Sequence, residues 1–122
     1  MPPKASKTAA EMIPLTPAIY GILLALGDAE MHGYAIMRVL SDRTGGHEKI
    51  LPGTLYASLS RMVDDGLVEE GEAPAGEASG GPQRRYYRRT QFGRAVAQAE
   101  SERLRRLLEI AVSQNIVPGV VG

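Results

Sequence analysis

Hydrophobic residues recur at helical spacing in four stretches of the chain, and residues that start or stop helices bound each stretch. The first predicted helix covers residues 17–26, where Thr16 can cap the helix and Pro17 fits its first turn. This segment is apolar nearly all round, so we expect it to be buried on more than one side. A second helix is predicted over residues 33–44 and ends at two consecutive glycines.

The third predicted helix, residues 52–65, lies in the stretch LPGTLYASLSRMVDDGLVEE. Pro52 starts it, and Gly66 is the residue type expected just past a helix end. Apolar residues at i, i+4, i+7 and i+8 predict one core-facing stripe, made of Leu55, Leu59, Met62 and Val63. Helical spacing of ~100° per residue gathers Thr54, Ser58 and Arg61 on a different face.

Two short strands are predicted next, over LVEEGEA (67–73) and RRYYRRT (84–90), with a hairpin tip rich in Gly, Ala, Pro, Ser and Glu between them. Alternation along the second strand places Tyr86 and Tyr87 on opposite faces. The pattern therefore predicts three helices, a two-stranded hairpin and then a long helix.

Thr90 can cap that last helix, which is predicted over residues 91–114. Its apolar side drifts along the segment through Phe92, Val96, Ala99, Leu104, Leu107, Leu108 and Ala111. A helix that reaches past so small a core is a candidate surface for pairing with another chain. The first twelve residues, with two early prolines, are expected to form a mobile arm.

Composition narrows the class of protein. A chain of 122 residues with 43% hydrophobic residues supports one modest core, and domains this small often gain burial by pairing with a second copy. No apolar run approaches the roughly 18 residues of a membrane span, and the N-terminal residues lack the apolar stretch of a secretory signal. The absence of cysteine excludes a disulfide framework and a thiolate metal site. We therefore expect a cytoplasmic protein without a membrane partner.

Catalytic chemistry is poorly supported by the residue pattern. His32 and His47 lack a nearby carboxylate pair at ligand spacing, so we expect surface or capping histidines. The glycines of ASGGPQ do not lie between a strand and a helix N-terminus, as a phosphate-binding loop requires. We expect no enzyme, no cofactor and no metal site.

Charge is distributed unevenly along the chain, although the net charge is zero. Residues 11–77 carry four basic side chains against eleven acids, whereas residues 78–122 carry eight arginines against three acids. Four of these arginines fall in RRYYRR, residues 84–89. Such a cluster is typical of a polyanion-binding surface, and an ordinary solvated arginine-rich surface explains the charge alone equally well.

Three features agree on one geometry for nucleic-acid binding. Two helices joined by a short connection can present the second of them, residues 52–65, to a DNA major groove. Arg84 and Arg85 lie at the base of the hairpin, within reach of an adjacent groove or backbone. The long last helix could form a two-fold dimer that places two reading helices about one DNA turn (~34 Å) apart. Each feature alone also fits a solvated face or a core cap, so their joint occurrence in this order favours double-stranded DNA as the partner.

The segments HGYAIMRVL, LPGTLYASLSRMVDDGLVEE and GPQRRYYRRTQFGR resemble the signature segments of the PadR family of bacterial transcription regulators. The resemblance spans about residues 15–111, with the segments in the family's order. The matching positions are His32, Gly33 and Tyr34; Gly53, Thr54, Leu55 and Tyr56; Gly66, Leu67 and Val68; and Arg84, Arg85, Tyr87, Thr90 and Gly93.

This resemblance implies a mainly α protein with a small β-hairpin (α+β), namely a winged helix-turn-helix followed by a C-terminal dimerisation helix. It implies a flexible arm at 1–14, a DNA-binding domain at 15–90, a dimerisation helix at 91–114 and a tail at 115–122. The expected DNA-binding residues are Thr54, Tyr56, Ser58, Arg61, Arg84 and Arg85. Tyr56 and Tyr87 are either polar-tipped core residues or contacts; we favour a phosphate-facing hydroxyl for Tyr56 and a structural role for Tyr87.

By the resemblance, the chain is a dimeric repressor that a small-molecule effector could release. Some small relatives bind flat aromatic drugs between paired tryptophans, but this chain has no tryptophan. The hairpin tip carries Glu72 and Glu77, which would repel phosphate, so we expect contacts at the base of the wing. The alternative function is a winged-helix protein-interaction module without useful DNA affinity, which the acidic first two-thirds of the chain favours.

Overall fold

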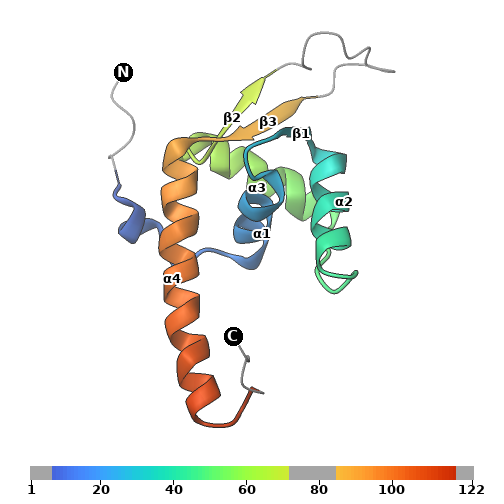
Figure 1. Cartoon of the computed structure of the whole chain (residues 1–122). Coiled ribbons are helices and arrows are strands. Elements are labelled where there is room, and N and C mark those ends of the chain that lie inside the picture. Colours follow the sequence, from blue (N-terminus) through green and yellow to red (C-terminus); the bar gives the residue numbers. More distant parts are fainter. Residues whose placement is uncertain (1–6, 72–84, 118–122) are drawn as a thin grey trace.

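The computed structural model describes residues 7–71 and 85–117. In chain order the elements are the 3₁₀ helix η1 (Ala9–Met12), α1 (Pro17–Leu26), β1 (Glu30–His32), α2 (Gly33–Arg43), α3 (Pro52–Asp64), β2 (Val68–Gly71), β3 (Tyr86–Arg89) and α4 (Gln91–Ser113). The predicted α+β class and the winged helix-turn-helix are confirmed, and all four predicted helices are present (Figure 1).

Capping side chains define the helix ends, as the sequence predicts. The Thr16 hydroxyl accepts a hydrogen bond from the Ile19 N–H at 3.1 Å, and Pro17 occupies the first turn of α1. The Thr90 hydroxyl caps α4 in the same way, accepting from the Gly93 N–H at 2.9 Å. Gly66, just beyond α3, has a φ of +77°, a backbone conformation that favours glycine.

Helix α1 lies at the centre of the core and packs against α2, α3 and α4, which is why it is apolar nearly all round (Figure 1). Helix α3 contributes the buried residues Leu55, Leu59 and Met62. Val63, predicted to share that core face, is only half-buried because it lies at the edge of the stripe.

The sheet has three strands in the order β1-β3-β2, with both pairings antiparallel. The sequence prediction of a two-stranded hairpin missed β1, whose three residues are too few for an alternating pattern. Both tyrosines of the central strand β3 are buried: Tyr87 joins the core, and Tyr86 packs edge-on against the His32 ring, with ring centroids 5.5 Å apart. The predicted hairpin tip lies outside the described residues.

The N-terminal segment differs from the predicted mobile arm at residues 8–12. The Thr8 N–H donates to the Glu11 carboxylate at 2.8 Å, and the Thr8 hydroxyl accepts from the Glu11 N–H, which forms a capping box for η1. Helix η1 packs against α4, and Met12 and Ile13 lie against the core. Apolar burial at these two residues offsets the entropy of ordering the segment.

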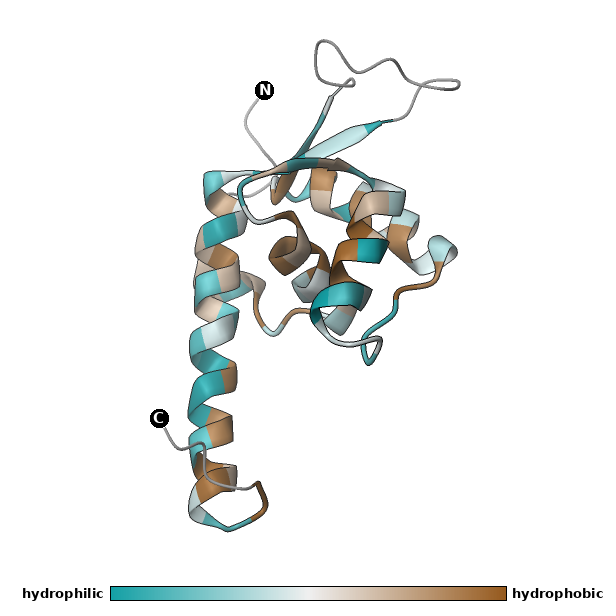
Figure 2. Ribbon diagram, turned by 45° about the vertical axis from the view of Figure 1, so that its right-hand side comes forward, coloured by the Kyte–Doolittle hydropathy of each residue, from teal (hydrophilic) through white to brown (hydrophobic). Residues whose placement is uncertain are grey.

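Helix α4 has two halves with different surroundings. Its buried residues are Gly93, Val96, Ala97 and Glu100, and none of the described α4 residues beyond Glu100 is buried. The distal half projects away from the body (Figure 2). It bears exposed apolar side chains, namely Leu104, Leu107, Leu108 and Ile110. Over the part of the chain that the structure describes, none of the helices combines the length and apolar character needed to cross a bilayer.

Candidate nucleic-acid interface

The candidate reading face lies on α3, where four of the six predicted DNA-binding residues occur. Thr54, Tyr56 and Arg61 are exposed, and Ser58 is half-buried. Leu55 and Leu59 are fully buried on the other side of the helix and hold this face outward. Thr54, Ser58 and Arg61 share this face, as the sequence predicts, whereas helical spacing places Tyr56 ~160° around α3 from Thr54, beside Gly33 of α2.

Arg61 retains a guanidinium that can bind a ligand. Its Nε lies 4.0 Å from the Asp65 Oδ2, at the outer limit for an ion pair, and its side chain is 76% exposed. A pair this long and this solvated holds the side chain only weakly. The Arg61 guanidinium is therefore available for a guanine edge or a phosphate.

The base of the wing is less positive than the sequence indicates. Arg85 Nη1 lies 3.3 Å from the Glu70 Oε1, and Arg88 forms an ion pair and a hydrogen bond with Glu69 that raise the pKa of Arg88. The register of β2 against β3 places Glu69 opposite Arg88. Sequence spacing does not show cross-strand partners, so the charge count along the chain does not predict this pairing. Arg84, the sixth predicted residue, lies outside the described residues.

Tyr87 has the structural role that we favoured from the sequence. It is buried, and its hydroxyl donates a hydrogen bond to the Glu70 Oε2 at 3.3 Å. Burial, followed by the nearby Glu70 charge, raises the pKa of Tyr87. Since the same carboxylate is paired with Arg85, Glu70 links the core tyrosine to the wing arginine.

Two exposed residues of α2 extend the candidate surface and were missed by the sequence reasoning. Tyr34 is 58% exposed, and the Arg38 guanidinium lies 6.0 Å from the centroid of its ring. Within the described ranges Arg38 forms no ion pair with an acidic side chain. An aromatic and an arginine at i and i+4, off the apolar stripe, are the signal that could have found them.

Helices α2 and α3 approach closely where Tyr56 crosses Gly33. A Cβ added at Gly33 would lie 2.6 Å from the Tyr56 hydroxyl, so glycine makes room for that side chain. Tyr56 is nevertheless 51% exposed. The neighbouring His32 caps α2, its Nδ1 accepting from the Ala35 N–H at 3.2 Å, which confirms the capping role expected of that histidine.

The family model described as "Transcriptional regulator PadR-like family" matches residues 22–99, from the middle of α1 to the first half of α4. The chain belongs to this family. A curated protein of Lysinibacillus sphaericus, named "Uncharacterized protein X", is 35% identical over 74 residues, which are 61% of this chain and 65% of that protein. The match thus spans less than two thirds of that relative's length.

Solved structures of PadR-type regulators share the fold. A PadR family transcription regulator from Clostridium difficile superposes with a TM-score of 0.68 at 22% identity, over 84% of this chain and 100% of that chain. Bacillus subtilis PadR, solved in complex with operator DNA, gives a TM-score of 0.58 at 22% identity, over 75% of this chain and 48% of that chain. The family and these structures are transcription regulators.

Gly93 matches a position of the PadR signature, and this structure gives a steric reason for glycine there. A Cβ at Gly93 would lie 2.1 Å from the carbonyl oxygen of Leu67 and 3.1 Å from its carbonyl carbon. Only glycine lets the first turn of α4 pass this close to the end of the α3–β2 turn. The glycine therefore fixes where α4 leaves the winged-helix body of this PadR-like protein.

Proposed function

We propose that this chain is a dimeric, sequence-specific DNA-binding transcriptional regulator that acts as a repressor. The observation that carries the proposal is the exposed polar face of α3, with Thr54 and Arg61 held outward by a buried stripe. Bacillus subtilis PadR, which has the same fold, was solved with operator DNA, and this supports the same use of the fold here. A dimer that covers promoter DNA excludes polymerase from it, which is the simplest route to repression.

We assign roles to the site residues by their chemistry. Arg61 reads a guanine edge through two parallel hydrogen bonds, and Thr54 and Ser58 bind base edges or phosphates. Tyr56 donates its hydroxyl to a phosphate. Arg84 and Arg85 contact the backbone beside the wing.

Arg38 adds a phosphate contact from α2, for which its charge is free of any acidic partner among the described residues. Here residues 15–90 form the DNA-binding domain, and residues 91–114 the dimerisation helix. The two copies of α3 stand about one DNA turn (~34 Å) apart.

The effector site that we propose is an open groove between α1, β3 and α4, with a volume of about 450 Å³. Its lining combines apolar groups, Leu24 and Ala97, with polar and charged ones, among them Arg94 and an Arg105 that is paired with Glu102 of the same groove. This volume is in the range of small-molecule sites. A ligand here would contact both the winged-helix body and the helix that we assign to dimerisation.

The decisive substitution pair is Arg61→Ala and Arg85→Ala, tested on DNA that the protein itself selects from a random library. We expect Arg61→Ala to weaken binding to the selected site by about tenfold or more, with little effect on random DNA, because it removes a base contact. Arg85→Ala should weaken both DNAs about equally, since a phosphate contact carries no sequence information. Fluorescence anisotropy measures both affinities. An equal loss for Arg61→Ala on both DNAs would refute its base-reading role.

The alternative, a winged-helix protein-interaction module, is favoured by one observation, the pairing of wing arginines with Glu69 and Glu70. A salt series separates the two functions. Phosphate contacts make log affinity fall linearly with log salt, by about 0.9 per phosphate neutralised. If no DNA binds even at low salt, the regulator proposal fails and the interaction module replaces it.

Gly33→Ala is expected to weaken binding to the selected site by about tenfold without unfolding the protein. The added methyl group displaces the Tyr56 hydroxyl, and a lost hydrogen bond to a charged phosphate costs about 1.5 kcal/mol or more. The fold survives because Tyr56 is half-exposed and can swing outward. Anisotropy and urea titration give the two readouts. In a Tyr56→Phe background, Gly33→Ala should cause no further loss; a full second loss would show that the two residues act separately.

A further inference from the structure

Glu100 is the one buried charged residue among those described, with 2% of its surface exposed. Its carboxylate accepts three hydrogen bonds: from the Leu15 N–H at 3.3 Å, from Arg103 Nε at 2.7 Å and from Arg103 Nη2 at 2.8 Å. These bonds from Arg103 hold the pKa of Glu100 below its usual range against the opposing effect of burial. The buried carboxylate is therefore ionised near neutral pH.

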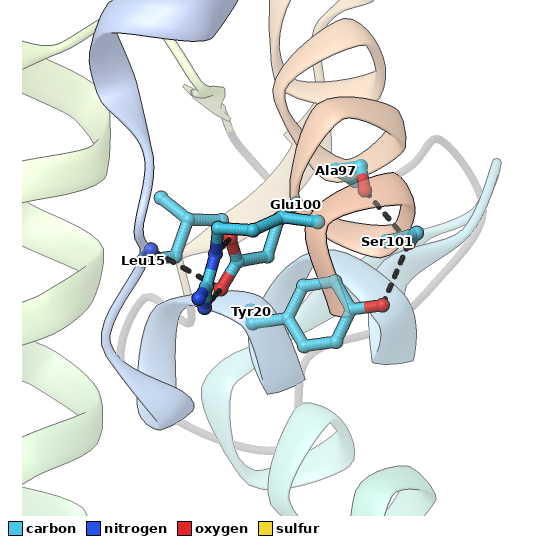
Figure 3. A network of polar contacts seen from close by, with 6 residues as sticks. Leu15, Tyr20, Ala97, Glu100 and Ser101 are labelled. Carbon is cyan, nitrogen blue, oxygen red and sulfur yellow. Dashed lines mark hydrogen bonds and ion pairs between the residues drawn. The ribbon is translucent and has the colours of Figure 1, made fainter. Parts of the chain in front are cut away.

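A second polar contact lies at the adjacent residue of α4. Tyr20 of α1 meets Ser101, with the two hydroxyl oxygens 2.6 Å apart, and the Ser101 hydroxyl lies 2.7 Å from the Ala97 carbonyl oxygen (Figure 3). Since the single Ser101 proton goes to the carbonyl, the Tyr20 hydroxyl donates to Ser101. The two contacts join α4 to the segment before α1 and to α1 itself.

These contacts lie where α4 leaves the winged-helix body, and we call this point the pivot of α4. Glu100 is the last buried residue of α4, and the helix continues beyond it to Ser113. In Figure 1, η1 and α1 lie on either side of α4, so the connecting segment that contains Leu15 passes across the helix. The family match ends at residue 99, just before this pivot.

The geometry resists tilting of α4 in more than one direction. Consecutive helical residues point ~100° apart, so Glu100 and Ser101 hold the helix along two nearly perpendicular directions. Hydrogen bonds depend on direction, whereas the apolar contacts made by Val96 and Ala97 do not. A well-packed apolar residue would stabilise such a site as well as a buried ion pair does, so the retained carboxylate points to orientation rather than stability.

We propose that Glu100, Arg103, Tyr20 and Ser101 are positioning residues that fix the angle at which α4 leaves the winged-helix body, and thereby set the half-site spacing that the dimer accepts. This rests on the proposed function. The 13 residues that follow Glu100, up to Ser113, form an arm of ~20 Å, so a rotation of ~10° displaces its tip by ~3.5 Å. One base pair of DNA rises ~3.4 Å, so a small change of angle equals one step of spacing.

The first test measures the angle without DNA. The chain has no cysteine, so Ser60→Cys and Ser113→Cys, both at exposed positions, accept a pair of nitroxide labels, and dilution with unlabelled protein leaves only distances within one chain. Pulsed electron paramagnetic resonance then reports the position of the α4 tip relative to α3. We expect Glu100→Met to shift or broaden this distance by about 3 Å, the displacement of a ~10° rotation.

Three further variants grade the effect. Glu100→Gln keeps an acceptor for the Leu15 N–H, so its change in the label-to-label distance should be smaller than that of Glu100→Met. Tyr20→Phe removes one hydroxyl with little change of packing, and it decides the question if Glu100→Met does not fold. The matched control is Glu109→Gln, which removes an exposed carboxylate of the same helix, 3.1 Å from Arg105, and should leave the distance unchanged.

The second test measures spacing on DNA selected by the parent protein and rebuilt with one base pair added or removed between half-sites. The parent should prefer its own spacing by about tenfold, and Glu100→Met should reduce that preference below about threefold while binding a single half-site as the parent does. Unchanged label-to-label distances in both Glu100→Met and Tyr20→Phe would refute the claim that these residues fix the angle of α4. Changed distances in a variant that keeps the parent's spacing preference would refute the claim that this angle sets the half-site spacing. If the parent selects no DNA, the proposed function and the spacing role both fail, while the distances still decide whether Glu100 holds α4.

Discussion

Gly93→Ala is expected to lower the free energy of unfolding by about 3 kcal/mol or more, the upper range for overpacking a closed site. The new Cβ would lie 2.1 Å from the Leu67 carbonyl oxygen, far inside van der Waals contact. That carbonyl cannot retreat at low cost, since it accepts a hydrogen bond from the Thr90 N–H at 3.1 Å, and the Thr90 hydroxyl binds the preceding carbonyl, that of Gly66, at 2.6 Å. Either α4 shifts or its N-terminal cap breaks. Urea denaturation followed by circular dichroism measures the loss.

Gly53→Ala is the matched control for this prediction. Gly53 lies in the first turn of α3, and a Cβ there would meet no atom within 4 Å. Alanine should therefore raise the free energy of unfolding by up to about 1 kcal/mol through its better helix propensity. If Gly93→Ala cost no more than about 1 kcal/mol relative to the parent, α4 would have to be free to move away from Leu67.

The helices could be predicted from the sequence because their signals are local. Thr16, Thr90 and Gly66 define helix ends through contacts within one turn, so spacing alone placed them. Strand β1 could not be predicted in this way. Its three residues are ordered by pairing with β3, more than fifty positions further along the chain, and a local pattern carries no such information.

The sequence predicted the exposed face of α3 but not the charge pairing at the wing. Helical spacing put Thr54 and Arg61 on an exposed face, which the structure shows. Counting charges failed at the wing, because an arginine counts as positive whether or not an acid lies opposite it on the next strand. Arg88 and Glu69 form such a pair, whereas Arg38 has no acidic partner within the described part of the chain.

Glu100 shows the limit of pattern reasoning most clearly. A glutamate among the charged residues of a long helix fits a solvated face, yet Glu100 is buried and accepts a hydrogen bond from Leu15, in a segment far away in the sequence. The same helix illustrates the opposite case. Leu104, Leu107 and Leu108 follow a core-like pattern, yet the chain itself leaves them exposed. An apolar stripe indicates burial, but not which molecule provides it.

Leu108→Glu is expected to convert the proposed dimer into a monomer at micromolar concentration and to weaken binding to the selected two-half-site DNA by at least about 100-fold. Leu108 is 45% exposed in the single chain and lies on the stripe with Leu104 and Leu107. Two-fold pairing through this stripe would bury one new carboxylate from each copy, at several kcal/mol per unpaired ion. Light scattering measures the mass, and anisotropy on the two-half-site DNA measures binding.

Ser113→Glu adds the same charge near the end of the same helix, and helical spacing of ~100° per residue places it on the face opposite Leu108. It should remain dimeric and bind DNA as the parent does. Leu108→Glu should keep the parent's helical circular dichroism, because the side chain is solvated in the single chain. A Leu108→Glu protein that stays dimeric would show that the copies pair elsewhere, and the exposed stripe of α4 would then need a different partner.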